Sequence, residues 1–254
     1  MDIESLLRTY LKDLDGVAVA YSGGIDSTAL LGIVTRIFPE KHVGVFVDSP
    51  LLSERQRDSA LRVANEISAN IVIVKLDWSD LSEVMKNDGK RCYHCKRTIY
   101  SAVRDVAKDF DIKVCLDGEN ASDDHDDRPG HVAASELMMK SPFCDLGISR
   151  NDVVSYINGM NLAEVLVKDT CMATRIPTGT SFSEKEMRLV EKCEQLVRNI
   201  TGVIQLRVRI NGNRARILTS PEEIFLLKES KNQLDSELTK IGLNIEIDEN
   251  GYVE

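Results

Sequence analysis

GVAVAYSGGIDS, residues 16–27, joins a continuous apolar run to two glycines and the start of a helix. A continuous apolar run is typical of a strand that is buried on both faces of a parallel sheet. Gly23 and Gly24 allow a sharp turn and a close approach of the backbone to an anion. The helix predicted from Asp26 to Ile37 adds its N-terminal amides. The segment therefore predicts a phosphate loop after the first strand of a parallel sheet.

The same alternation of apolar runs and amphipathic stretches continues to about residue 118. It predicts further strands at 42–48, 70–77 and 112–118, and helices at 53–68 and 96–109. Buried strands separated by helices indicate an α/β fold, a parallel sheet sandwiched by helices. Ligands of such sheets bind beyond the carboxyl ends of the strands.

The pattern changes after about Cys171. A helix is predicted at 183–199, and two alternating runs at 202–210 and 214–220 flank Asn211-Gly212, which indicates a hairpin. A helix at 221–241 and a strand at 243–248 complete a small α+β domain. The boundary is predicted in the stretch IPTGTS, which gives domains 1–175 and 176–254, the second for substrate binding and oligomerisation.

Composition restricts the class of protein. The chain has 254 residues, a formal net charge of −9 and six cysteines. It contains no apolar run near the roughly 20 residues that span a bilayer, and its start differs from a signal peptide. We therefore expect a cytoplasmic protein without a membrane partner, in which disulfides do not persist. The acidic balance argues against a nucleic-acid partner.

The loop after the first strand offers specific phosphate ligands. The hydroxyls of Ser22, Ser27 and Thr28, with the amides of the glycines, can surround a phosphate. Asp26 would repel that phosphate unless it helps to hold Mg²⁺. Neither a Walker loop nor G-x-G-x-x-G is present. The alternative is an ordinary strand–helix turn, but S-G-G-x-D-S at this place favours a nucleotide site.

This loop resembles the PP-loop of the N-type ATP pyrophosphatases, which have an adenine-nucleotide α-hydrolase-like fold. The resemblance implies that the loop holds the β- and γ-phosphates of ATP while a substrate oxygen attacks the α-phosphorus. It also implies ATP contacts at Asp48 and Gly118, which end the second and fourth predicted strands. For Asp48, the alternative is a solvated acid at the end of a strand.

The segment RCYHCK, residues 91–96, carries Cys92 and Cys95 and is predicted to lie in the loop before a helix. Its flanking cations favour the thiolate form. Among the later cysteines, Cys171 is the one in a polar, loop-like segment. The other three are interpreted as structural: Cys115, Cys144 and Cys193.

Two adjacent thiolates and one distant thiolate match the ligands of a [4Fe–4S] cluster whose fourth iron is left open. Such an iron can bind a sulfide or a substrate. Two alternatives stay open, namely a cysteine pair without metal and a zinc site that includes His94 or His125.

The segments SGGIDS, RCYHCK, DGENASDD, RPG, CMATRIPTG and QLRVR, in this order, resemble the LarE family of ATP-dependent sulfur transferases. That family adenylates a carboxylate of a pyridinium dicarboxylate mononucleotide, releases pyrophosphate, and replaces the activated oxygen with sulfur for a nickel-pincer cofactor. One branch consumes the sulfur of the cysteine that matches Cys171. Another holds a [4Fe–4S] cluster on the positions of Cys92, Cys95 and Cys171, and this chain resembles that branch.

The resemblance also implies a sulfide donor and a homo-oligomer, a hexamer. The segment CMATR departs from the CLASR of the sacrificial branch, and DGENASDDHDD is unusually acidic. Because of these two departures, the resemblance does not fix which substrate the enzyme modifies with ATP.

Arg207 and Arg209 alternate along a predicted strand and so share one face. A planar guanidinium group can donate two parallel hydrogen bonds to the oxygens of a phosphate. The resemblance implies that this pair lies near the phosphate of the mononucleotide. A solvated strand face is the alternative. The rival functions are a PP-loop tRNA thiolation enzyme, an amidotransferase-type synthetase and a catalytically silent ATP or Fe–S binding protein.

Overall fold

The computed structural model describes residues 2–123, 129–160, 162, 166 and 169–251. Contacts divide the chain into two units. The first unit is Met1–Val84 with Lys90–Val167, and the second is Met85–Gly89 with Lys168–Glu254. The second unit thus begins a few residues before the boundary predicted at 175/176 and also takes in a short earlier segment.

The first unit is built on a parallel sheet, which confirms the predicted α/β class. Its strand order is β3-β2-β1-β4, with every neighbouring pair parallel. The strands are β1 (Val17–Tyr21), β2 (His42–Asp48), β3 (Ile71–Lys75) and β4 (Val114–Leu116).

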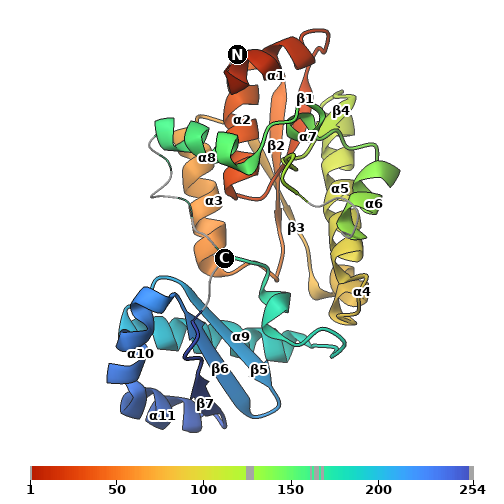
Figure 1. Ribbon diagram of the computed structural model, residues 1–254. Coiled ribbons are helices and arrows are strands. Elements are labelled where there is room, and N and C mark those ends of the chain that lie inside the picture. The colour runs from red at the N-terminus through yellow and green to blue at the C-terminus, as the bar shows by residue number, and fades with distance from the viewer. Residues whose placement is uncertain (1, 124–128, 161, 163–165, 167–168, 252–254) are drawn as a thin grey trace. The chain divides into compact units, whose positions relative to one another are not determined.

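Helices cover both faces of this sheet (Figure 1). One face is covered by α1 (Ile3–Leu11), α2 (Ile25–Ile37), α3 (Glu54–Glu66) and α8 (Arg150–Gly159). The other is covered by α5 (Arg91–Asp109) and α6 (Pro129–Glu136). Shorter elements are η1 (Trp78–Leu81), α4 (Ser82–Met85) and α7 (Pro142–Asp145). No helix among the described residues is long and apolar enough to cross a membrane.

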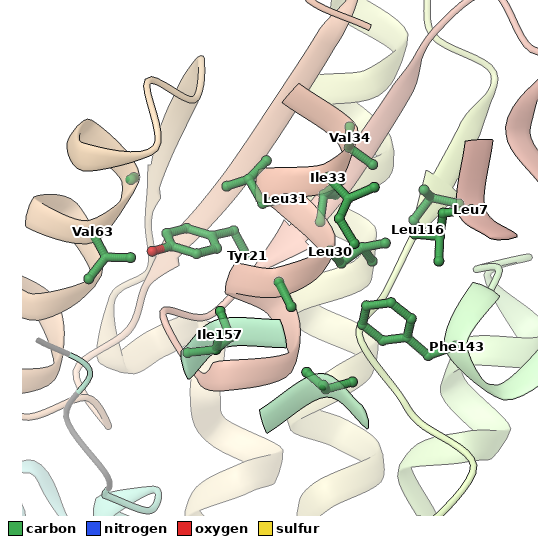
Figure 2. Packing of buried hydrophobic residues seen from close by; sticks show 14 of the residues in the cluster. Leu7, Tyr21, Leu30, Leu31, Ile33, Val34, Val63, Leu116, Phe143 and Ile157 are labelled. Atoms are coloured by element: carbon green, nitrogen blue, oxygen red, sulfur yellow. The ribbon is translucent and has the colours of Figure 1, made fainter. Parts of the chain in front are cut away.

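The central strand β1 explains why its sequence is apolar throughout. Val17, Val19 and Tyr21 pack into the cluster beneath α2, while Ala18 packs into the cluster beneath α5. Figure 2 shows the first of these clusters, in which Tyr21 lies between Val63 and Leu31. Both faces of the strand are therefore removed from water, as the continuous run predicts.

Two predicted helices differ from the observed ones. Helix α5 begins at Arg91, so RCYHCK forms its first turns and the predicted loop is wrong. Residues 91–109 contain neither glycine nor proline, so the sequence allows the helix to start directly after Gly89-Lys90. The predicted helix 221–241 is broken into η3 (Pro221–Glu223), α10 (Ile224–Glu229) and α11 (Lys231–Thr239).

The second unit contains a three-stranded sheet. Strands β5 (Leu206–Asn211) and β6 (Arg214–Thr219) form the predicted antiparallel hairpin, and β7 (Asn244–Ile247) pairs parallel to β6. The connection is Gly212-Asn213, one residue later than predicted, and Gly212 takes the positive φ of 59° that the turn requires. Helix α9 (Glu184–Thr201) and the short η2 (Met172–Arg175) add buried residues to the core of this unit, as do α10 and α11.

Candidate nucleotide and thiol site

The loop between β1 and α2 is tight because it is made of glycine where side chains have no room. Gly23 has a φ of 76°, and a Cβ there would lie 2.4 Å from the Cβ of Ala60. Gly118, just after β4, also lies close to neighbouring backbone, because a Cβ at this position would lie 2.9 Å from the amide nitrogen of Ser27. Two strand ends therefore approach the start of α2 as bare backbone, which is the form that an anion site requires.

Helix α2 presents its N-terminal amides without a side-chain cap within the described residues. Four other helices of the described chain are capped by side chains, namely α1 by Asp2, α3 by Ser53, α8 by Ser149 and α9 by Ser183, whereas α5 begins without such a cap, as α2 does. Ser22 and Ser27 hydrogen-bond to each other through their hydroxyls at 3.0 Å. Uncapped amides beside two hydroxyls are the donors that bind a phosphate.

Asp26 is held by two partners that come from distant parts of the chain. Its Oδ1 accepts a hydrogen bond from Nδ2 of Asn120 at 3.2 Å, and its Oδ2 forms an ion pair with Arg150. Burial raises the pKa of Asp26 above the ordinary value, and the charge of Arg150 offsets only part of that effect. The carboxylate thus lies partly buried at the start of α2 and is paired with one cation.

The end of β4 is fixed by a second buried carboxylate. Asp117 is 3% exposed and accepts hydrogen bonds from the hydroxyls of Tyr100 at 3.0 Å and Ser141 at 2.7 Å. Burial raises its pKa. These bonds fix the backbone that leads into Gly118. Asp48, at the end of β2, pairs instead with Nε of Arg57 at 2.6 Å.

The helix that carries the cysteine pair is tied to the same strand end. Lys96 and His131 both interact with Glu119, which follows Gly118. Burial alone would raise the pKa of Glu119, but hydrogen bonding to Lys96, the charge of Lys96 and hydrogen bonding to His131 lower it. The first turns of α5 are therefore anchored at the carboxyl end of the parallel sheet.

Cys92 and Cys95 are three residues apart on α5 and share one helical face, with Cβ atoms about 5–6 Å apart. Cys92 is exposed and Cys95 is half-buried. His94, two residues after Cys92, lies off that face. His125, the other proposed zinc ligand, lies outside the described residues.

The three remaining cysteines are poorly suited to act as ligands. Burial raises the pKa of Cys115, raises that of Cys144 to about 12 and raises that of Cys193 to about 11. Metal binding and nucleophilic attack both require the thiolate. All six cysteines lie in the described part of the chain, and none forms a disulfide.

In the second unit, Cys171 precedes η2 in a segment held by the buried guanidinium of Arg175. Arg175 is 0% exposed and pairs with Asp169 at 2.6 Å and with Glu194 at 2.8 Å. It also donates to the carbonyl oxygen of Thr170 at 3.0 Å. The carboxylates raise its pKa despite burial, which keeps the charge on the guanidinium.

Glu194 extends this network to the arginine strand. Its Oε1 accepts a hydrogen bond from the backbone amide of Val208 at 3.1 Å, between Arg207 and Arg209 on β5. Those arginines share the face of β5 opposite to its buried residues. The second unit therefore links the segment of Cys171 to the strand of Arg207 and Arg209 through one chain of charged contacts.

The residues of the candidate site divide between the units. The first contains the phosphate loop, Asp48, Gly118 and the cysteine pair, and the second contains Cys171 with the two arginines. Within the described ranges, no three His, Cys, Asp or Glu side chains are grouped so as to hold a metal ion.

Sequence reasoning missed Asn120 and Arg150. Asn120 belongs to the quoted segment DGEN, so a signal for it exists. Arg150 stands in ISRND without any pattern that would identify it.

Comparison with known proteins places the chain in a family. No family model matches it. It is 30% identical over 216 residues to the pyridinium-3,5-bisthiocarboxylic acid mononucleotide synthase of Lactiplantibacillus plantarum, an alignment that covers 84% of this chain and 78% of that protein. The chain belongs to the LarE family.

Other relatives fit this membership of the LarE family. An uncharacterized protein of Methanocaldococcus jannaschii is 29% identical over 239 residues, covering 91% of this chain and 90% of that protein. The NH(3)-dependent NAD(+) synthetase of Carboxydothermus hydrogenoformans is 28% identical over 82 residues, 32% of this chain. Together with the parallel sheet and its glycine loop, they identify the PP-loop fold of an ATP-using enzyme.

Proposed function

We propose that this protein is an ATP-dependent sulfur transferase that adenylates a substrate carboxylate and then replaces oxygen with sulfur. The observation that carries the proposal is the glycine loop before α2, a helix that has no side-chain cap within the described residues and begins beside the hydroxyls of Ser22 and Ser27. The relative from Lactiplantibacillus plantarum, a synthase of a bisthiocarboxylic acid, supports the sulfur chemistry.

The first unit would perform the adenylation. Ser22, Gly23, Gly24 and Ser27 would hold the β- and γ-phosphates of ATP, and Asp26 would help to hold Mg²⁺. An oxygen of the substrate carboxylate attacks the α-phosphorus, and the bond to the β-phosphate oxygen breaks. Pyrophosphate leaves with its charge balanced by the amides and the metal ion. Asp48 and Gly118 would contact the nucleotide.

The thiols would supply the second half of the reaction. Cys92, Cys95 and Cys171 would be the ligands of a [4Fe–4S] cluster, since three thiolates leave one iron without a protein ligand and burial raises the pKa of each of the other three thiols above its usual value. Such a cluster, when bound, would supply a sulfide, and attack of that sulfide on the acyl-adenylate would release AMP. The alternative is that Cys171 gives up its own sulfur atom.

The substrate would be held by the second unit. The name of the Lactiplantibacillus plantarum relative specifies a pyridinium mononucleotide, and a phosphate of that kind suits the paired forks of Arg207 and Arg209. We also propose that the protein works as a homo-oligomer, a hexamer as the resemblance implies, and takes its sulfide from a donor.

The first experiment is to purify the protein without oxygen and to measure its iron and acid-labile sulfide. We expect about four irons per chain and a broad thiolate-to-iron absorption band. Cys171→Ala should lose the band, whereas the matched variant Cys193→Ala should keep it, because Cys193 is a buried thiol within α9.

An iron-free protein would instead assign the sulfur to Cys171. Mass spectrometry after turnover would then show the loss of one sulfur atom from the peptide that contains this residue. Retention of the band in Cys171→Ala would contradict its role as a ligand.

The rival functions are tested by two further measurements. Filter binding with bulk tRNA should show no affinity beyond that of other polyanions, as the net charge of −9 predicts. Release of pyrophosphate with a pyridinium dicarboxylate mononucleotide would exclude a catalytically silent binding protein.

A further inference from the structure

One charged contact of the phosphate loop has no role in the function proposed above, namely the ion pair between Asp26 and Arg150. Both oxygens of Asp26 are engaged, Oδ1 by the amide of Asn120 and Oδ2 by the guanidinium of Arg150. Mg²⁺ takes one or two carboxylate oxygens in nearly octahedral geometry. A carboxylate oxygen can accept more than one partner, but Mg²⁺ bound to Asp26 would lie beside the positive charge of Arg150, and the repulsion between the two cations favours the departure of Arg150.

Asn120 is the partner that stays. It is 3% exposed, and its own Oδ1 accepts the backbone amide of Ser122 at 2.9 Å. Its backbone amide donates to Asp123 at 3.1 Å. Asn120 is thus held through both its side chain and its backbone, and its displacement would leave buried polar groups without partners.

Arg150 is the partner that can move. Its side chain is 46% exposed, whereas its backbone amide is fixed by Oγ of Ser122 at 3.1 Å. The preceding Ser149 caps α8 and fixes the start of that helix. A guanidinium on a long, partly solvated stem can therefore change partners while its backbone stays in place.

We propose that Arg150 is a phosphate-binding residue of the ATP site, which exchanges Asp26 for β- and γ-phosphate oxygens when Mg²⁺ takes its place on the carboxylate. The exchange keeps every charge paired, since Asp26 gains a divalent cation and Arg150 gains an anion. The planar fork of arginine matches two phosphate oxygens. This inference rests on the proposed ATP-dependent function and adds a residue to it.

The test is a comparison of Arg150→Gln with the wild-type chain in direct binding of Mg²⁺–ATP and of AMP. Loss of a charge-assisted contact should weaken Mg²⁺–ATP binding by about 10- to 100-fold and leave AMP binding unchanged. Arg150→Lys, which keeps the charge but not the fork, should recover part of the affinity. The matched control is Arg8→Gln, since Arg8 is also an exposed arginine in an ion pair, with Glu4.

A second measurement uses ATP in metal-free buffer. Asp26→Asn removes the competing carboxylate, so this variant should bind free ATP more tightly than the wild type. Adding Arg150→Gln to it should abolish that gain, and this dependence would not follow from a merely structural contact.

Three results would overturn the inference. Wild-type affinity of Arg150→Gln for Mg²⁺–ATP would remove the phosphate role while leaving the proposed function intact. Equal losses for ATP and AMP would show a general distortion of the site. Failure of the wild-type chain to bind ATP at all would overturn the proposed function, and the inference with it.

Discussion

The ion pairs of Asp26 in the first unit and of Arg175 in the second consist of the same chemical groups in different environments. Arg175 is 0% exposed and is paired with two carboxylates that are themselves nearly buried. Asp26 is paired with a guanidinium that is 46% exposed. Water cannot replace a lost partner of the buried Arg175, whereas water can reach the pair of Asp26 and Arg150 at the phosphate loop.

This difference separates a fixed ion pair from an exchangeable one. Removing one partner from a buried pair leaves a charge with neither water nor an opposite charge. Removing one partner from an exposed pair lets water take its place. We therefore expect the Arg175 network to hold the segment of Cys171 in place, and the Asp26 network to change partners during the reaction.

The largest expected effect is on stability in Arg175→Met. The substitution leaves the buried Asp169 without its cation and Glu194 with the more distant Arg198, at 3.8 Å, so the free energy of unfolding of the second unit should fall by about 3 to 5 kcal/mol. Urea unfolding followed by circular dichroism would show an early transition. The fluorescence of Trp78, which lies in the first unit, should keep its midpoint.

The control for this prediction is Arg188→Met, because Arg188 pairs with Glu184 on the surface of α9 and is 72% exposed. Its loss should change stability by less than about 1 kcal/mol. Equal losses in the two variants would mean that burial does not distinguish these ion pairs, and the comparison would fail.

The fold followed from the sequence because its signals are local. Each strand of the parallel sheet is one apolar run, and the phosphate loop is seven consecutive residues, 21–27. The hairpin of β5 and β6 likewise depends on one glycine turn. Such features reflect short-range sterics and burial, which a single sequence displays directly.

The partners of the site could not be predicted in the same way. Arg150 reaches Asp26 across 124 residues, and a lone arginine between Ser149 and Asn151 has no spacing that reveals its neighbour. The buried state of Arg175 was also hidden, since an arginine in a polar segment is ordinarily exposed. Tertiary packing decides both, and it appears only in the structure.

The next effect in size is catalytic, in Asp26→Asn. Pyrophosphate release should fall by about 100- to 1,000-fold, because the substitution removes a charged ligand where charge develops. The iron content should not change. Asp235→Asn, in an exposed pair with Lys231, is the control and should keep full activity. Full activity in Asp26→Asn would remove the residue from the mechanism.

The stability of the same variant should move in the opposite direction from that of Arg175→Met. Burial raises the pKa of Asp26, so its ionised form is less favourable in the folded chain than in the unfolded chain. A neutral asparagine removes that cost above the raised pKa. We expect a melting temperature equal to or above that of the wild type, and a marked decrease would show that the carboxylate is structural.

The smallest effect tests the exchangeable pair itself, through a double-mutant cycle of Asp26→Asn and Arg150→Gln. The coupling free energy in urea unfolding, followed by Trp78 fluorescence, should be about 0.2 to 1 kcal/mol at neutral pH, the range of solvent-exposed pairs. It should decline as the pH falls through the pKa of Asp26, because protonation removes the negative charge. A coupling of several kcal/mol would make this pair as fixed as that of Arg175, and an arginine so tightly held could not leave Asp26 for a phosphate.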